Sequence, residues 1–406
     1  MIEQNKLNEL IAIFEATNYK LAIELAKKFT KEFGHNGTGW NVLGLSLKAN
    51  GDLDESIKIF KFLISALPKN AAYVSNLGNT YMLIGRIKDG INCFKKALKL
   101  QPNLVNAIEA LGLAYTEIGR VKDAAKYFGQ VIELDPSNQS SPYYLGNLYL
   151  NDQNWAEAEK YLRASQFGLS QSHVLECLLC LDNRAGFESQ YEVLANAGVC
   201  NPLIGGLISH AEELYETRFS NNFCEDPINY LHVDRVDEKD GLTEDLLLRI
   251  IEYHYSKKND YRDQKLLHNG SQSSGNIFLT DEAFVTELKL TIESKITRYR
   301  EMHANSKEGF IRHWPEKYQL FGWMVSMKSG GKLDAHNHKE GWLSGSLYLS
   351  LPDKGDKNTI DGNIAFSHSG PRYPSIKHPA ERRVVDISER DVCIFPSSLF
   401  HETIPF

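Results

Sequence analysis

The stretch Leu111-Gly112-Leu113-Ala114-Tyr115, followed by Gly119, Phe128 and Pro136, sets the pattern for the first half of the chain. The same residue types return at a constant spacing of 34 residues, as from Leu77 to Leu111. Recurrence at this period predicts a helix–turn–helix unit repeated along the chain. The recurring positions are the pairs Leu43-Gly44, Leu77-Gly78, Leu111-Gly112 and Leu145-Gly146; Tyr81, Tyr115 and Tyr149; Gly51, Gly85 and Gly119, with Gln153 in the fourth place; Phe60, Phe94, Phe128 and Leu162; and Pro68, Pro102 and Pro136.

This pattern resembles the tetratricopeptide repeat. A single helix pair cannot bury its apolar face alone, so four stacked pairs share one continuous core. The glycine of each Leu-Gly pair lets the two helices of a pair approach closely. Residues 6–32 are a degenerate first pair, which places the repeats at 1–170. Such a superhelix exposes a concave face for a protein or peptide, and the alternative is a purely structural or dimerising array.

Residues 171–225 keep a helical character but lose the period. Breaks at Asn201-Pro202 and Gly205-Gly206 predict irregular helices that close the solenoid. Residues 221–227 are expected to form the linker to a third region at 226–406. Cys177 and Cys180 lie inside an apolar helix-like run, which indicates two buried helix cysteines. A redox or zinc pair would need turn residues and further ligands nearby.

Composition limits the class of protein. The chain has 406 residues, enough for two or three domains, and is 42% hydrophobic and 24% charged. A net charge of -7 without a basic run disfavours a nucleic-acid surface. Neither a membrane-length apolar stretch nor a secretory signal is present in the sequence. Six scattered cysteines fit a reducing compartment. We therefore expect a cytoplasmic protein without nucleic-acid or membrane partners.

The second half changes from helical to β character. Helical spacing persists at 243–256 and 281–303, separated by a polar glycine-serine loop at 269–276. After residue 318, short apolar runs bounded by Gly, Pro and Asp indicate strands. These runs cover 321–328, 342–351, 382–387 and 392–395, and such a succession of short strands predicts a barrel or jelly roll.

Three histidines in this region form a candidate metal site. His336 and His338 are two residues apart, so on extended backbone both rings leave the same face. His401 follows the predicted strand that ends at Phe395-Pro396, and a closed barrel would bring it opposite the pair. Neutral imidazoles suit Fe(II), Zn(II), Ni(II) or Cu(II). The alternative is a pair of histidines on a solvated loop.

The run 342–351 alternates between two faces. One face carries Leu343, Leu347, Leu349 and Leu351, and the other carries Trp342, Ser344, Ser346, Tyr348 and Ser350. The second face is a candidate lining for a polar pocket.

Residues 321–406 resemble the iron- and 2-oxoglutarate-dependent oxygenases, in particular a bacterial group often fused to tetratricopeptide repeats. The matching segments are Gly330-Gly331, His336-Asn337-His338, residues 342–348 and residues 395–401. The loop at 269–276 also resembles one of that group. The resemblance implies a multidomain protein, in which an all-α repeat superhelix precedes a double-stranded β-helix (jelly-roll, cupin-like) domain. It further implies Fe(II) held by His336 and His401, with 2-oxoglutarate as cosubstrate.

Within this resemblance, Ser344 and Tyr348 are candidates for hydrogen bonds to the cosubstrate. The activity implied is that of a dioxygenase that hydroxylates an unknown substrate. The attached repeats suggest a protein or peptide, although they could also tether an enzyme that acts on a small molecule.

Two features depart from the family pattern. His338 stands where the family has a carboxylate ligand. Either His338 binds the metal and completes a three-histidine site, or water takes the place of the third ligand. Asp334 and Glu340 lie nearby, but their spacing from His336 fits the family pattern less well. The family also anchors 2-oxoglutarate with a basic residue beyond the last ligand, and the sequence ends five residues after His401. We expect either truncation or a substitute among Lys328, Lys332, Arg372 and Arg382.

Two other classes compete with this interpretation. One is a non-catalytic repeat scaffold with a degenerate jelly roll. The other is a cupin-type three-histidine dioxygenase that uses O₂ without 2-oxoglutarate. A glutamate between the histidine pair and the last histidine would favour the second class, and Glu381 and Glu389 are available in Arg-rich segments.

Overall fold

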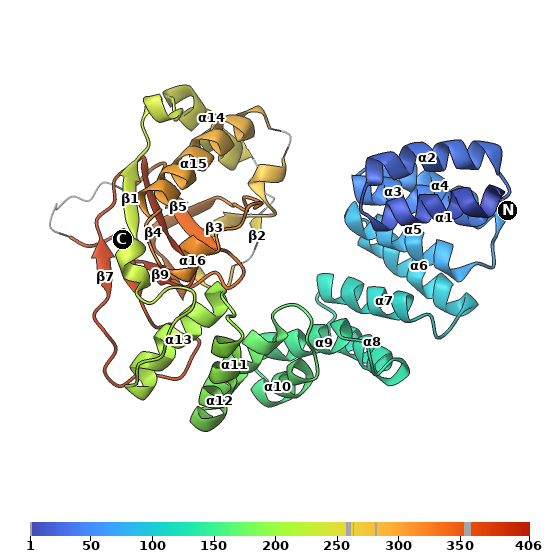
Figure 1. The fold of residues 1–406 in the computed structure, drawn as a ribbon. Helices are drawn as coiled ribbons and strands as arrows, with labels where there is room; N and C mark the ends of the chain where they lie inside the picture. Colours follow the sequence, from blue (N-terminus) through green and yellow to red (C-terminus); the bar gives the residue numbers. More distant parts are fainter. Residues whose placement is uncertain (1, 257–260, 263, 281, 353–358) are drawn as a thin grey trace. The chain divides into compact units, whose positions relative to one another are not determined.

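The computed structural model describes residues 2–256, 261–262, 264–280, 282–352 and 359–406. Its Cα positions divide the chain into two compact units, residues 1–171 and 172–406 (Figure 1). We call them the repeat unit and the C-terminal unit.

The repeat unit consists of helices in which each element packs against the next along the chain. Two helices cover residues 6–32, where the degenerate first pair is expected, and further helices follow them along the chain. Each predicted proline stands two residues beyond the last residue of a helix, where it cannot disturb the helical hydrogen bonds. The helices are α1 (Ile2–Glu15), α2 (Tyr19–Glu32), α3 (Gly37–Asn50), α4 (Leu53–Ala66), α5 (Ala71–Leu83), α6 (Ile87–Leu100), α7 (Val105–Glu117), α8 (Val121–Leu134), α9 (Ser140–Asn151) and α10 (Trp155–Arg163).

The two recurring series of glycines and large apolar residues are packing partners. A Cβ added to Gly78 would lie 2.6 Å from the ring of Phe94, and one added to Gly112 would lie 2.7 Å from the ring of Phe128. Both rings are fully buried. Each ring therefore fills the space that the missing side chain leaves, which explains why both positions recur together. The same contact joins Gly44 to Phe60 and Gly146 to Leu162.

The turn between the helices of each pair requires left-handed backbone. Gly51, Gly85 and Gly119 have φ of 92°, 76° and 71°. Gln153 occupies the equivalent turn with φ 56°, and Thr17 does so in the degenerate first pair with φ 58°. All five turns therefore keep the left-handed conformation, although it is sterically unfavourable for Gln153 and Thr17.

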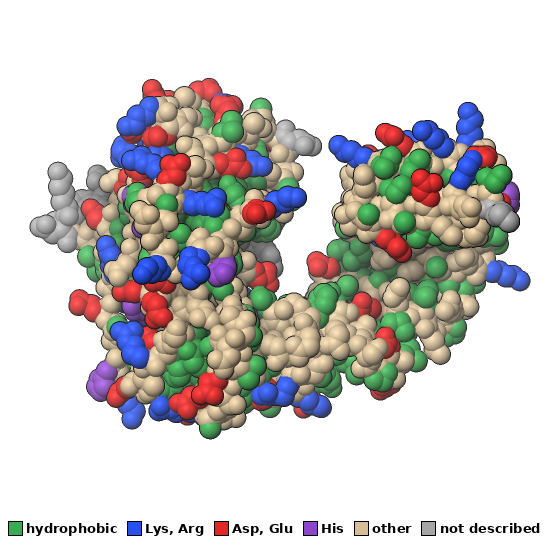
Figure 2. Space-filling view, viewed as in Figure 1, with side chains coloured by type: hydrophobic (Ala, Val, Ile, Leu, Met, Phe, Trp, Pro, Cys, Tyr) green, Lys and Arg blue, Asp and Glu red, His purple; other side chains and the backbone are tan. Residues whose placement is uncertain are grey.

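Charged and apolar side chains are interspersed on the face of the molecule in Figure 2. Several large apolar side chains of the repeat unit are exposed, among them Phe62 at 47%, Leu83 at 61% and Val121 at 47%.

Among the described residues, no helix is long and apolar enough to span a membrane.

The C-terminal unit combines helices with two antiparallel sheets. The smaller sheet has the strand order β1-β8-β5 and the larger β2-β3-β4-β9-β6-β7. The predicted fold class, a helical superhelix followed by an antiparallel jelly-roll domain, is confirmed. The elements are α11 (Ser170–Cys180), α12 (Arg184–Asn196), α13 (Pro202–Tyr215), η1 (Pro227–Tyr230), β1 (His232–Arg235), η2 (Glu238–Asp240), α14 (Glu244–Ser256), β2 (Tyr261–Arg262), β3 (Leu267–Ser273), η3 (Ile277–Leu279), α15 (Ala283–Met302), α16 (Gly309–Arg312), β4 (Val325–His336), β5 (Leu343–Leu347), β6 (Ile364–Ser367), β7 (Arg383–Val385), β8 (Asp391–Pro396) and β9 (Phe400–Thr403).

Strand β8 separates two cores. Val392 and Ile394 point to one face, where they join a core formed with residues of α14 and α15. Cys393 and Phe395 point to the other face and pack with Phe366 of β6. This period-2 arrangement places helices on the outer face of the small sheet and the large sheet against its inner face.

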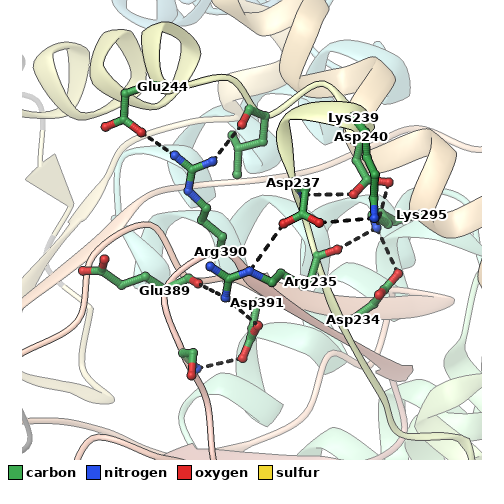
Figure 3. Close-up of polar contacts among 12 residues, drawn as sticks. Asp234, Arg235, Asp237, Lys239, Asp240, Glu244, Lys295, Glu389, Arg390 and Asp391 are labelled. Carbon is green, nitrogen blue, oxygen red and sulfur yellow. Dashed lines mark hydrogen bonds and ion pairs between the residues drawn. The ribbon is translucent and has the colours of Figure 1, made fainter.

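A buried lysine fastens α15 to the small sheet. Lys295 is 2% exposed in its side chain, and its ammonium lies 2.9 Å from Asp234 and 3.2 Å from Asp240 (Figure 3). Its third contact is the carbonyl oxygen of Arg235. Burial of this charge is tolerated because two carboxylates and a carbonyl surround it.

One prediction about the strands of the C-terminal unit was wrong, and the set of predicted strands was incomplete. Residues 269–276 were expected to be a loop, yet β3 extends to Ser273 and pairs with β4 through a bulge between His268 and Gly270. Polar residues form this strand because it lies near the sheet edge, where side chains remain partly exposed. Strands β1, β2, β6 and β9, each of four residues or fewer, were not predicted.

The segment expected to be a linker belongs to the core. Phe223 and Cys224 are fully buried among the apolar residues around α14 and α15. Helices α12 and α13, and α11 from Ser172 onward, were expected to close the solenoid but fall within the C-terminal unit. Cys177 and Cys180 lie in α11 as predicted; Cys177 is buried, whereas Cys180 is only partly buried.

Candidate metal centre

Two of the three predicted histidines are cross-strand neighbours. His336 is the last residue of β4 and His401 lies in β9, where their Cα atoms are direct partners. The register between β4 and β9 shifts between Leu333 and His336. Irregularities of this kind commonly re-aim side chains next to active sites. Long-range strand pairing therefore brings His401 beside His336.

His338 lies beyond the end of β4, so the prediction that both rings project from one strand face was incomplete. Its backbone N–H donates to the carbonyl of Ser397 at 3.2 Å, and the side-chain amide of Asn337 donates to the carbonyl of Ser398 at 3.3 Å. These two contacts fold the residues after β4 back over the turn that precedes β9.

The three rings converge. Ring centroids are 4.4 Å apart for His336 and His401, 5.1 Å for His336 and His338, and 5.2 Å for His338 and His401. One nitrogen from each ring lies within 4.8 Å of the others. Imidazole ligands bind a metal at about 2.1 Å, which requires nitrogens roughly 3 Å apart. A small inward movement of the rings would complete such a site.

Hydrogen bonds orient two of the rings. His336 Nδ1 lies 2.9 Å from the carbonyl oxygen of Asp334, and His401 Nδ1 lies 3.4 Å from that of Leu399. An Nδ1–H that donates to a carbonyl leaves Nε2 with its lone pair for a metal. His336 and His401 therefore each carry a proton on Nδ1, which leaves Nε2 as the nitrogen that can bind a metal.

Burial keeps these histidines neutral. It lowers the pKa of His336, and burial together with the charge of His336 lowers the pKa of His338 to about 4. The pKa of His401 is lowered well below its usual value by burial and by the other two rings. Near neutral pH all three nitrogens are free of competing protons, so they can act as ligands.

Aromatic side chains surround the histidines. Phe395 lies 4.8 Å and Phe366 6.4 Å from the ring of His401, and Trp323 lies 5.6 Å from that of His338. Trp323 in turn contacts Phe321, which is 68% exposed. The histidines are therefore bordered by apolar rings, and the chain of ring contacts from His338 through Trp323 ends at the exposed Phe321.

The nearby carboxylate of Asp334 is already engaged. It lies 2.7 Å from His268 Nε2 and 2.7 Å from Lys332 Nζ. Among the described residues, the group able to hold a metal consists of the three histidines and includes no carboxylate. The three-histidine arrangement is therefore the one that the geometry favours, and direct ligation by His338 stays a prediction.

The two predicted cosubstrate residues lie on β5 and just after it. Ser344 Oγ is 2.7 Å from Ser397 Oγ, next to the residues that hold His338. Tyr348 packs against the inner core with Phe366 and Phe395, and burial raises the pKa of its phenol. Both roles in cosubstrate binding remain predictions.

The predicted alternation of residues 342–351 holds for the apolar residues Leu343, Leu347 and Leu349 on one face and for Tyr348 on the other, and it fails at both ends of the run. Trp342 was placed on the polar face, but it packs on the helix side with Leu343 and donates to the carbonyl of Phe310 at 2.8 Å. Leu351 was placed on the Leu343 face, but it packs against the inner core. The strand itself covers only Leu343–Leu347, and the alternation continues through Tyr348 and Leu349 but not to Leu351.

Three of the four basic residues considered as cosubstrate anchors are paired with protein carboxylates. Lys332 contacts Asp334, Arg372 contacts Glu176, and Arg382 contacts Glu402. Glu402 follows His401 on β9, so its side chain leaves the opposite face of the strand. Arg382 therefore lies on the face away from the histidines.

Sequence reasoning missed the contacts that surround His338. Lys339 Nζ donates to the carboxylate of Glu176 in α11, and a Cβ added to Gly206 in α13 would lie 2.4 Å from Asn337 Nδ2. A charged residue inside the apolar run of α11 was the available signal for the first contact.

Comparisons with known proteins agree with this architecture. Residues 322–406 match a family model described as "Putative 2OG-Fe(II) oxygenase". Residues 71–104 and 109–172 match models of the tetratricopeptide repeat. Both resemblances inferred from the sequence are thereby confirmed. No curated protein matches the chain.

Solved structures similar to part of this chain include the following proteins. PilF of Pseudomonas aeruginosa is 14% identical, covering 48% of this chain and 91% of its own, with a TM-score of 0.43. PilW, described as a type IV pilus biogenesis factor, is 16% identical, covering 48% and 92%, with a TM-score of 0.43. A thermophilic tetratricopeptide-repeat protein of Thermus thermophilus is 20% identical, covering 46% and 98%, with a TM-score of 0.37.

Proposed function

We propose that the C-terminal unit is an Fe(II)- and 2-oxoglutarate-dependent dioxygenase that hydroxylates a protein or peptide substrate. The observation that carries this proposal is the convergence of His336, His338 and His401 within 4.8 Å. The match of residues 322–406 to an oxygenase model supports the choice of iron and of 2-oxoglutarate.

The donor set suits the proposed metal. Three neutral imidazoles bind Fe(II), and they leave its positive charge uncompensated. An uncompensated dication attracts the anionic 2-oxoglutarate more strongly than one bound by a carboxylate. When bound, Fe(II) with O₂ supplies the oxidative decarboxylation of 2-oxoglutarate to succinate and CO₂, coupled to hydroxylation of a substrate C–H bond.

The remaining residues take supporting roles in this proposal. Phe366 and Phe395 keep water from the inner side of the site. Ser344 donates a hydrogen bond to the cosubstrate after releasing Ser397, which lies 2.7 Å away. Tyr348 donates from the inner core, where burial keeps its phenol protonated. Both groups can orient a carboxylate without carrying charge themselves.

The repeat unit binds the polypeptide substrate or a protein that delivers it. Support comes from the tetratricopeptide matches and from exposed apolar side chains such as Phe62 and Leu83. Large apolar groups left on a surface favour association with another apolar surface. The proposed occupant of the concave face is therefore a protein or peptide.

Succinate formation tests the catalytic proposal. Wild-type protein loaded with Fe(II) is expected to convert 2-oxoglutarate to succinate, and His336→Ala is expected to lose this turnover. His35→Ala is the matched control, because that histidine is exposed in the repeat unit with a side-chain exposure of 77%. Equal succinate formation by wild type and His336→Ala would sink the proposal.

A three-histidine dioxygenase without 2-oxoglutarate is the second candidate, favoured by the absence of a carboxylate from the histidine group among the described residues. Oxygen consumption separates the two. Metal-dependent O₂ uptake that requires 2-oxoglutarate supports the first candidate, and substrate-dependent uptake without it supports the second.

A further inference from the structure

A buried carboxylate lies behind the metal centre. The side chain of Glu176 in α11 is 0% exposed. His173 Nδ1 lies 3.0 Å from one of its oxygens. The other oxygen accepts from Lys339 Nζ, lies 3.3 Å from Arg372 Nε and accepts from the Tyr373 hydroxyl at 3.4 Å. A carboxylate buried to this degree is stable only with such partners, so the cluster holds its members together.

Lys339 joins this cluster to the segment that carries His338. Its side chain is 21% exposed, and it directly follows His338 in the chain. On the other side of His338, Asn337 donates to Ser398 and packs against Gly206 of α13, which has no room for a side chain. Helices α11 and α13 therefore hold the residues before and after His338.

The three histidines differ in how they are fixed. His336 and His401 are cross-strand partners, so the backbone ladder of β4 and β9 sets their positions. His338 lies outside the ladder. Its N–H donates to the carbonyl of Ser397, and its own carbonyl accepts from the N–H of Gly341, so it is held by a turn and not by strand pairing. Its ring position consequently depends on the side-chain anchors next to it.

We propose that Glu176 is a positioning residue of the metal centre, which holds His338 in place through Lys339. The inference rests on the proposed metal centre. It also means that α11, which lies outside the region matched by the oxygenase model, helps to position a residue of the metal centre. Supporting contacts of this kind commonly change metal affinity by about ten- to a hundredfold.

Co(II) titration followed by its visible absorption spectrum tests this role, because it needs neither substrate nor turnover. Glu176→Gln is expected to raise the Kd for Co(II) by about ten- to a hundredfold and to change the absorption bands. In a His338→Ala background the same change is expected to have no further effect on Kd. A residue that only stabilised the fold would weaken binding in both backgrounds.

Lys339→Met is the second variant, and it remains informative if Glu176→Gln does not fold, because Arg372 still neutralises Glu176. By electrostatics alone, Lys339→Met should strengthen Co(II) binding because it removes a positive charge near the site. Glu176→Gln should weaken Co(II) binding because it removes a negative charge. Weaker Co(II) binding in both variants therefore indicates positioning. Tighter binding by Lys339→Met, or a wild-type Kd in either variant, would overturn the inference.

Asp234→Asn is the matched control. It removes one of two carboxylates from the buried Lys295, in the same unit (Figure 3). It is expected to lower the thermal unfolding temperature while the Kd for Co(II) stays at the wild-type value. A wild-type protein that does not bind Co(II) would overturn the proposed metal centre and this inference with it, whereas unchanged Kd in Glu176→Gln overturns the inference alone.

Discussion

At the scale of single residues, the three histidines are not equivalent. His336 and His401 each point Nδ1 at a backbone carbonyl and lie in paired strands, so their Nε2 atoms have a fixed direction. His338 stands where the resemblance to the iron oxygenases led us to expect a carboxylate, and it is fixed by its neighbours. Its contribution to metal binding is therefore the most informative single measurement.

His338→Ala is expected to weaken Co(II) and Fe(II) binding by roughly a hundredfold, since it removes a ligand that has no substitute in the histidine group. His338→Asp, which restores the two-histidine, one-carboxylate arrangement, is expected to bind more tightly than His338→Ala. Competition with a chelator measures both. A wild-type affinity in His338→Ala would instead indicate a two-histidine site completed by water.

The stability of the C-terminal unit is expected to depend on pH through His210. This histidine of α13 is 1% exposed, accepts from the Gly370 N–H and donates to the carbonyl of Pro374 at 3.0 Å. Burial lowers its pKa to about 4, against 6.5 for the unperturbed group, although the Pro374 hydrogen bond opposes this shift. The unfolded chain therefore binds the proton first as pH falls. Stability is complete above about pH 6.5 and is lost progressively toward pH 4.

His210→Gln removes this titration. The loss of unfolding free energy between pH 7 and pH 5 is expected to be about 2 kcal/mol smaller in the variant than in the wild type. Chemical unfolding at the two pH values, followed by the fluorescence of the tryptophans, measures the difference. Equal losses in the two proteins would contradict the assignment.

At the scale of elements, the turn between the two helices of a repeat adopts a left-handed backbone conformation whichever residue occupies it. Gln153 adopts φ 56° where three repeats have glycine. A non-glycine residue meets a steric penalty there, because its Cβ approaches the following carbonyl oxygen.

Gln153→Gly is expected to stabilise the repeat unit by about 1 kcal/mol, because it removes that penalty. Gly119→Gln is the matched reverse change at the equivalent turn, where φ is 71° and no atom lies within 4 Å of an added Cβ. It is expected to destabilise by a similar amount. Thermal unfolding checks both, and shifts in the same direction would show that backbone strain is not the cause.

At the scale of the whole molecule, the oxygenase-type region is larger than the 322–406 segment that matches the family model. The outer face of β8 is covered by a core that includes Phe223, Leu246 and Phe310. Those residues lie before residue 322, so the small sheet cannot bury that face from the matched segment alone.

A fragment of residues 172–406 is therefore expected to fold and bind Co(II) with the affinity of the full chain. A fragment of residues 322–406 is expected to remain unfolded, because Val392 and Ile394 would face water. Near-ultraviolet circular dichroism and Co(II) titration distinguish the two. Tight Co(II) binding by the shorter fragment would show that the preceding helices are dispensable.

The sequence by itself determined the repeat period, the turns, the helix ends and the three histidines. These features are local or strictly periodic, so the residue types reveal them without knowledge of distant contacts. Only the tertiary structure decided that Phe94 fills the space over Gly78, that β9 pairs with β4, and that α11 to α13 belong with the sheets. Such contacts join segments far apart in the chain and depend on complementary surfaces, which spacing along the sequence does not encode. The contact of Glu176 with Lys339 is of this second kind, because the buried partner of a charge becomes visible only when the two elements meet.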